Sequence, residues 1–263
     1  GIYNEIENAY RQNMFAREGR KESLVDLFHG LEDKNTTGDN EKNLYHLAAR
    51  FFDYQAIEYL GGEGVKPRKD DNGNSPFHEI PRSPYNNDVT NFQKMENAIY
   101  RTTKGLIDLG VNPKKKNEDG EIAYVIAGKA CMYPFIQAMA DAGVKMDAVG
   151  DEGKNILHMI TDVLYHRKNV NGFRENAYKT IKILLESGFP DPEDKDIFNR
   201  TPLEYAQKSD VKEIAALING DEDAKKTGGM TLNQAVLNND LEAVQALLEG
   251  GADPNEIFDD KYT

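Results

Sequence analysis

A polar turn that leads directly into a helix start sets the frame of this chain. It is Asp70-Asp71-Asn72-Gly73-Asn74-Ser75-Pro76-Phe77-His78. Asp, Asn and Gly favour tight turns, because their side chains or their backbone freedom stabilise turn geometry. Ser75 suits a helix cap, where its hydroxyl accepts a backbone N–H, and Pro76 suits the first helical position, where a missing N–H costs nothing. We therefore expect a turn that ends near Asn74 and a helix that begins at Pro76.

The same frame recurs along the chain, and each copy is followed by a second apolar segment that ends at or near a glycine. The copies are Asn43-Leu44-Tyr45-His46, Ser75-Pro76-Phe77-His78, Gly120-Glu121-Ile122-Ala123-Tyr124-Val125, Asp151-Glu152-Gly153-Lys154-Asn155-Ile156-Leu157-His158, Asn199-Arg200-Thr201-Pro202-Leu203-Glu204 and Thr231-Leu232-Asn233-Gln234-Ala235. The second segments include residues 57–64, 106–110, 183–188 and 246–255. This repetition predicts a repeat protein, in which each helix pair buries its apolar face against its neighbours.

In this pattern the chain resembles the ankyrin repeat family. Units of that family join a turn with Asp and Gly to Thr-Pro-Leu-His, a short helix, and a second helix that ends Leu-Leu before Gly-Ala-Asp-x-Asn. The resemblance covers nearly the whole chain and is most specific at residues 70–78, 199–206 and 231–255. It implies an all-α, ankyrin-type helical solenoid with short β-turn or hairpin fingers. We expect about six repeats, two of them with insertions between their helices.

The domain organisation follows from the places where the frame is present or interrupted. Residues 1–31 carry two helical patterns, so we expect an array over 1–220 that starts with an N-terminal helical cap. Residues 221–229 are polar and are expected to form a linker. A further repeat is expected at 230–263, either incomplete or the start of a second array. Residues 259–263 resemble the opening turn of one more repeat, which suggests that the natural protein continues.

Two repeats are longer than the others, and their insertions are the part least typical of the family. The first insertion runs from Glu79 to about Phe92 and the second lies around 166–172. Aromatic residues on loops make good interface anchors, so we take Tyr85, Phe92, Tyr165 and Phe173 as candidate protein-binding residues. The alternative is that each of these rings packs onto its own long helix.

The resemblance implies that the turn tips project as fingers and that the tips and the first helices line a concave binding surface. The tips differ in charge: Lys114, Lys115 and Lys116 are basic, whereas Asp194 and Asp196 belong to an acidic tip. Opposite charges along one face orient a partner protein. The alternative is that both clusters are solvated turns.

Composition excludes several classes of function. The formal net charge of −13 argues against a nucleic-acid-binding surface, because phosphate binding needs basic side chains, but it leaves open a basic protein partner. The single cysteine, Cys131, permits no intramolecular disulfide. No apolar run approaches the roughly 18–20 residues that a membrane span needs. We expect a soluble, monomeric protein that is cytoplasmic or exported after processing.

A metal site on one helix face is the main chemical alternative. His158, Asp162 and His166 follow one another at four-residue steps and lie on one face if the helix runs that far. Imidazole and carboxylate groups at this spacing can bind a divalent ion. In the resembled family, however, the His at the positions of His46, His78 and His158 is structural and hydrogen-bonds the backbone of neighbouring turns. We therefore expect no catalytic residue, no metal and no cofactor.

The sequence thus predicts a non-catalytic protein–protein interaction module. It would bind a partner protein through its finger loops, its concave face and the insertions between helices. One alternative is an acidic regulatory or inhibitory protein that occupies a basic site on an enzyme or a nucleic-acid-binding protein. A metal protein that uses the His158 helix and a spacer that carries another domain are the others.

Overall fold

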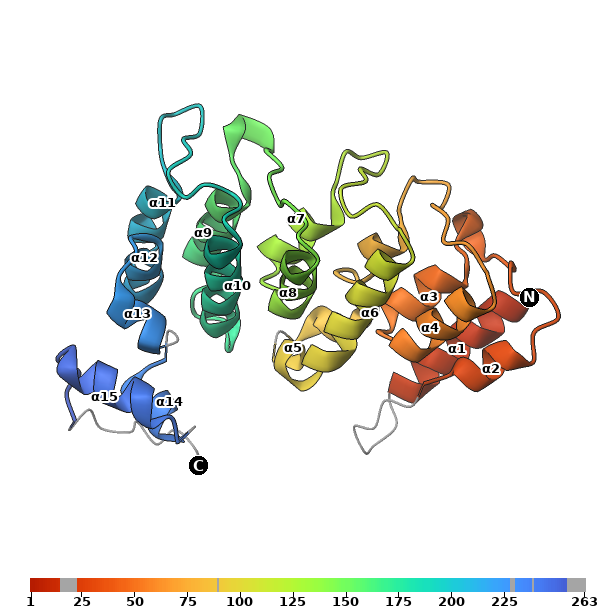
Figure 1. The fold of residues 1–263 in the computed structure, drawn as a ribbon, viewed down its shortest axis with the longest axis horizontal. Coiled ribbons are helices and arrows are strands. Elements are labelled where there is room, and N and C mark those ends of the chain that lie inside the picture. Colours follow the sequence, from red (N-terminus) through yellow and green to blue (C-terminus); the bar gives the residue numbers. More distant parts are fainter. Residues whose placement is uncertain (15–22, 89, 228–229, 238, 255–263) are drawn as a thin grey trace. The chain divides into compact units, whose positions relative to one another are not determined.

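The computed structural model describes residues 1–14, 23–88, 90–227, 230–237 and 239–254 (Figure 1). Contacts divide the chain into two compact units, Gly1–Met146 and Asp147–Thr263. Both units consist of helices joined by turns, and the described residues contain isolated β-bridges but no strand. The fold is all-α, as the sequence predicts. None of the described helices is both long enough and apolar enough to cross a membrane.

In the first unit, the elements form two layers of a stack. The elements are α1 (Ile2–Met14), α2 (Val25–His29), η1 (Asp39–Glu41), α3 (Leu44–Arg50), α4 (Tyr54–Gly62), η2 (Pro76–Glu79), η3 (Pro84–Asn87), α5 (Asn91–Lys94), α6 (Glu96–Asp108), α7 (Ala123–Lys129) and α8 (Tyr133–Asp141). One layer contains α3, η2 and α7, and each packs against the next; the other contains α2, α4, α6 and α8. The pairs α3–α4 and α7–α8 join the layers. This is the stacking of helix pairs that the repeats predict.

The second unit has the same arrangement. Its elements are η4 (Asp151–Gly153), α9 (Ile156–Arg167), α10 (Phe173–Ser187), α11 (Pro202–Ser209), α12 (Lys212–Ile218), α13 (Glu222–Thr227), α14 (Leu232–Leu237) and α15 (Leu241–Glu249). The first helices α9 and α11 pack against each other, and the second helices α10 and α12 do the same. The turn predicted at 259–263 lies outside the described residues.

Side-chain caps explain why several first helices begin where they do. Asn43 accepts a hydrogen bond from the backbone N–H of Tyr45 at 3.1 Å, and Asn155 accepts one from that of His158 at 3.1 Å. These bonds satisfy backbone donors that have no partner inside the helix. The recurring polar residue at the start of the frame is therefore a helix cap.

The first long repeat departs from the expected helix pair. A helix does begin at Pro76, but it is a 3-10 turn that ends at Glu79. Pro81 follows directly, and a proline removes a backbone donor and clashes with the preceding turn, so the helix stops. The second helix of this repeat is in two pieces, α5 and α6, which are separated at Met95.

The expected polar linker at 221–229 contains a packed helix. Its residues Glu222–Thr227 form α13, which contacts α12 and α15, and the Ala224 side chain is buried. The Tyr178 hydroxyl donates a hydrogen bond to the Ala224 carbonyl. A short packed helix therefore lies within this polar segment. The division of the chain into an array, a linker and a further repeat stays a prediction.

Candidate protein-interaction surface

Within each unit, neighbouring turn tips are joined by backbone hydrogen bonds. The N–H of Asp71 donates to the carbonyl of Asn40 at 2.9 Å, and the N–H of Glu118 donates to that of Asn72 at 3.0 Å. In the second unit the N–H of Ile197 donates to the carbonyl of Glu152 at 2.9 Å. Each bond links one finger to the finger before it, so the tips of a unit form a continuous edge.

Three buried histidines fix the base of the fingers. The Nε2 atoms of His46, His78 and His158 lie 3.0, 3.1 and 2.9 Å from the carbonyl oxygens of Asn74, Glu121 and Arg200. In each case the Nδ1 atom accepts the backbone N–H of the residue that caps the helix. Burial lowers the pKa of His46 and of His78 and so keeps both rings neutral near pH 7.

These bonds also bear on the metal alternative. Both ring nitrogens of His158 are engaged by backbone groups, so the ring has no lone pair free for an ion. Within the described residues, no three His, Cys, Asp or Glu side chains are grouped closely enough to hold a metal. His158 acts here as a structural link between two repeats.

The acidic finger of the second unit is organised around a buried carboxylate. Asp196 is only 5% exposed, and it accepts hydrogen bonds from the backbone N–H groups of Phe198 and Arg200, both at 2.9 Å. It also accepts the Tyr205 hydroxyl at 2.7 Å and the Arg200 guanidinium at 2.9 Å. Burial raises the pKa of this carboxyl, but these hydrogen bonds outweigh burial and hold the pKa well below its usual range. Asp196 was expected to contact a partner; its side chain is enclosed by its own turn, and a role in partner binding stays a prediction. Asp194 is exposed, as predicted.

The tip of the same finger exposes two large apolar side chains. Ile197 is 69% exposed and Phe198 is 56% exposed. The Arg200 guanidinium lies 4.6 Å from the centroid of the Phe198 ring and 4.7 Å from that of Tyr205, so it supports the Phe198 ring from one side. The finger thus presents an apolar tip held by a charged and aromatic base.

The sequence reasoning missed these two residues. The signal that could have found them is the apolar pair Ile197-Phe198 inside a turn where the other fingers carry polar residues. Turn residues of the repeated frame do not face the core. The sequence alone could therefore have indicated that Ile197 and Phe198 are exposed.

Charged and aromatic side chains continue from this finger onto the paired first helices. The Lys154 ammonium lies 5.2 Å from the centroid of the Tyr205 ring and pairs with Glu152 at 3.0 Å and with Asp162 at 3.3 Å. Tyr165, near the end of α9, is 48% exposed. The ammonium of Lys208, on α11, lies 5.7 Å from the Tyr165 ring centroid. Fingers and first helices of this unit therefore form one mixed polar and aromatic face.

The four aromatic residues in or beside the two insertions differ in their exposure to solvent. Phe92 and Phe173, two of the candidate partner-binding residues, are buried, at 1% and 0% exposed; their assignment to partner binding stays a prediction. Phe92 belongs to α5 and Phe173 is the first residue of α10, so both rings lie on helices of the long repeats. Tyr85 is half-buried, and its ring centroid lies 6.4 Å from that of Phe51 and 5.8 Å from that of Phe52. Of these four rings, Tyr165 alone offers a large exposed surface.

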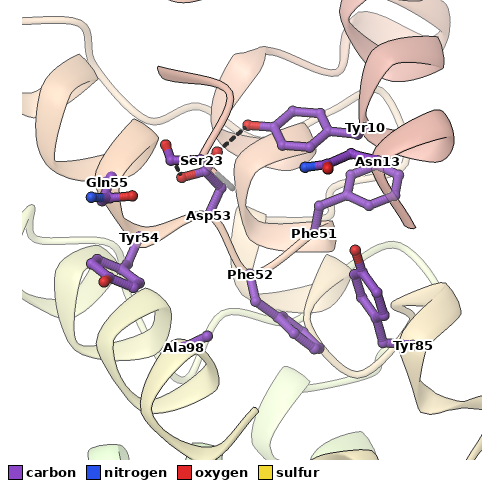
Figure 2. Close-up of a pocket in the computed structure, with 10 residues that line it drawn as sticks. All are labelled: Tyr10, Asn13, Ser23, Phe51, Phe52, Asp53, Tyr54, Gln55, Tyr85 and Ala98. Atoms are coloured by element: carbon purple, nitrogen blue, oxygen red, sulfur yellow. Dashed lines mark hydrogen bonds between the residues drawn. The ribbon is translucent and has the colours of Figure 1, made fainter. Parts of the chain in front are cut away.

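Figure 2 shows why Tyr85 is a packing residue. It lines a small cavity of about 70 Å³ together with Tyr10 and Ser23 from the N-terminal cap and Phe51 and Asp53. Asp53 accepts the hydroxyls of Tyr10 and Ser23, both at 2.8 Å, and it caps α4 through the backbone N–H of Ala56 at 3.1 Å. Burial raises the pKa of Tyr85. The first insertion is thus part of the contact between the cap and the first repeat.

Lys114, Lys115 and Lys116, the basic tip predicted from the sequence, are all exposed. They precede the finger turn at 117–121, and Lys116 bridges to Ile122 across its base. The structure places them in the first unit and Asp194 in the second. Whether any of them contacts a partner stays a prediction.

Comparison with known proteins agrees with these features. Residues 172–257 match the family described as ankyrin repeats, in 3 copies. These residues carry ankyrin repeats. Its fold is also similar to the crystal structure of an ankyrin repeat domain from Acinetobacter baumannii AYE, with a TM-score of 0.53 at 17% identity, over 84% of this chain and 94% of that one. No curated protein matches the chain significantly.

The predicted family and fold are thus confirmed, while the number of ankyrin repeats stays a prediction. Ankyrin repeats are in general protein–protein interaction modules, and their fold is typically not that of an enzyme. The finer question is which surface of this chain does the binding.

Proposed function

We propose that this chain is a non-catalytic module that binds a partner protein through the finger tips and first helices of its second unit. The observation that carries the proposal is the exposed pair Ile197 and Phe198 on a turn fixed by Asp196. A rigid turn that exposes large apolar side chains loses little entropy on binding. Such anchors, surrounded by polar groups, are typical of interface hot spots.

The surroundings of the tip support this assignment. Tyr165 and Phe198 offer aromatic surface, and Lys154 and Arg200 supply cations that are already held by neighbouring rings and acids. Interfaces are enriched in aromatic and Arg side chains of this kind. The proposed function uses no cofactor and no metal, since binding alone accounts for these groups.

An acidic regulatory or inhibitory protein is the second candidate, and one observation favours it. Asp191, Glu193 and Asp194 are exposed beside the apolar tip, and none of them forms an ion pair within the described chain. These carboxylates suit a basic site on the partner. The two candidates differ in salt dependence, because exposed charge pairs weaken as ionic strength rises whereas apolar contacts do not.

Partner capture with variant chains tests the proposal. The immobilised chain is exposed to extract of its source cells, and bound proteins are identified by mass spectrometry. The double variant Ile197→Ser, Phe198→Ser is expected to lose a partner that the wild-type chain retains. The matched control is Val236→Ser, Leu237→Ser, which removes an exposed apolar pair from α14 in the same unit. Retention by the finger variant, or equal loss from the control, contradicts the proposal.

A further inference from the structure

A basic groove lies in the first unit. It has a volume of about 230 Å³ and is lined mainly by residues of the loops that follow α4 and α6. Its basic lining residues are Arg68, Lys69 and Lys115. Its apolar lining comes from Pro67, Leu109 and Val111, among others. The groove therefore combines an apolar floor with a cationic edge.

The charge of this groove is opposite to that of the chain. Residues 66–69 and 114–116 hold six cations and no acid, in a chain whose formal net charge is −13. Arg68, Lys69 and Lys115 are exposed, and within the part of the chain that the structure describes none of the three is paired with an acid. Arg68, Lys69 and Lys115, exposed on two loops of an acidic protein, suit an anionic partner.

Local hydrogen bonds hold both loops in place. After α6, Gly110 adopts a left-handed conformation at φ +79°, and the N–H of Val111 donates to the Leu106 carbonyl at 3.1 Å. The N–H of Lys115 donates to the Asn112 carbonyl at 3.3 Å. On the other loop, the side-chain amide of Asn43 donates to the Arg68 carbonyl at 3.5 Å. The groove is therefore preformed, and binding does not require the loops to become ordered.

We propose that this groove binds an acidic peptide segment of a partner protein, with one apolar side chain seated on the floor formed by Pro67, Leu109 and Val111. The carboxylates of that segment lie against Arg68, Lys69 and Lys115. The proposal rests on the proposed function, protein binding, and adds a second contact site with the chemistry of its partner.

Size and charge distribution favour a peptide over other anions. The volume is below the roughly 300–1,000 Å³ of sites that enclose a whole small molecule, so the groove suits one side chain of a longer ligand. Nucleic acid needs an extended basic track. Here the basic stretch is short, because exposed Asp71, Glu118 and Asp119 follow in the same two loops.

Fluorescence anisotropy with a synthetic probe tests this assignment. The probe is a labelled short peptide of Asp and Glu with one central Phe, added to the whole chain. The double variant Arg68→Glu, Lys115→Glu is expected to weaken binding by about tenfold or more, since two attractive charge contacts become repulsive. The matched control Lys129→Glu changes an exposed lysine on α7 in the same unit and is expected to bind as the wild type does.

Two further probes separate the sources of affinity. Replacing the Phe of the peptide by Ala is expected to weaken binding several-fold, because the apolar floor loses its occupant. A single-stranded oligonucleotide is expected to compete poorly. Equal loss in the Lys129→Glu control, no effect of the double variant, or strong competition by the oligonucleotide overturns the groove assignment. If the peptide does not bind but partner capture still depends on Ile197 and Phe198, the groove assignment alone is refuted. If neither the peptide experiment nor the capture experiment gives the expected result, the proposed function is refuted as well.

Discussion

Buried His46 and His78 make the stability of the first unit depend on pH. In each ring one nitrogen faces a backbone carbonyl and the other accepts a backbone N–H, so only the neutral form satisfies both partners. Burial lowers both folded pKa values, and the unfolded chain therefore binds more protons once the pH falls below about 6.5. Stability that is fully present above that pH is lost as the pH drops toward the folded pKa values.

We therefore predict that the free energy of unfolding of the first unit decreases from about pH 7.5 to about pH 5.5. Urea denaturation followed by circular dichroism at several pH values measures it. The variant His78→Gln is expected to be less stable at pH 7.5 and to show a shallower pH dependence, because one of the two titrating rings is gone. An unchanged slope in that variant would place the pH dependence elsewhere.

Among the fingers of the first unit, Gly73 has a backbone conformation on which stability depends. Its φ is +74°, which side chains other than glycine's rarely tolerate, and an added Cβ would lie 3.2 Å from the backbone nitrogen of Glu118 in the next finger. We predict that Gly73→Val destabilises the unit by about 2 kcal/mol or more. Thermal denaturation checks this, with Gly62→Ala as control, because a Cβ at Gly62 meets no atom within 4 Å. Equal melting temperatures for both variants would contradict the argument.

At the scale of elements, the sequence predicted most of what local chemistry determines. The helix start at Pro76 and the all-α repeat stack are confirmed. The early end of η2 follows from Pro81, whereas the packing of α13 within a polar stretch depends on contacts with distant residues that periodicity does not show. The burial of aromatic residues in the insertions, such as Phe92, could not be predicted for the same reason, because it depends on the helices that surround each ring.

The two insertion tyrosines lead to opposite predictions for stability and binding. Tyr85 packs against Phe51 and Phe52, so Tyr85→Ala is expected to destabilise the first unit by about 2 kcal/mol. Tyr165 is 48% exposed, and Tyr165→Ala is expected to leave the melting temperature nearly unchanged. If the second unit binds as proposed, Tyr165→Ala weakens partner binding. Calorimetry and a pull-down on both variants measure these effects, and a large loss of stability in Tyr165→Ala would mark it as a packing residue.

At the scale of the whole molecule, the division into two compact units has a consequence for unfolding. Stability in a repeat protein is approximately a sum of terms for the repeats and for contacts between neighbours. Each unit has its own buried core and its own hydrogen-bonded fingers, so we predict two separable transitions in differential scanning calorimetry.

Two variants assign those transitions. Gly73→Val is expected to lower the transition of the first unit. Asp196→Asn is expected to lower that of the second by about 1–3 kcal/mol, because the hydrogen bonds to Arg200 and Tyr205 lose their charged acceptor. The loss of stability caused by Asp196→Asn is also expected to become smaller as the pH falls below about 3.9. The low folded pKa of Asp196 stabilises the unit only while this carboxyl would be ionised in the unfolded chain, so its contribution is lost as the pH drops. A single transition that both variants shift equally would show instead that the repeats unfold as one cooperative array.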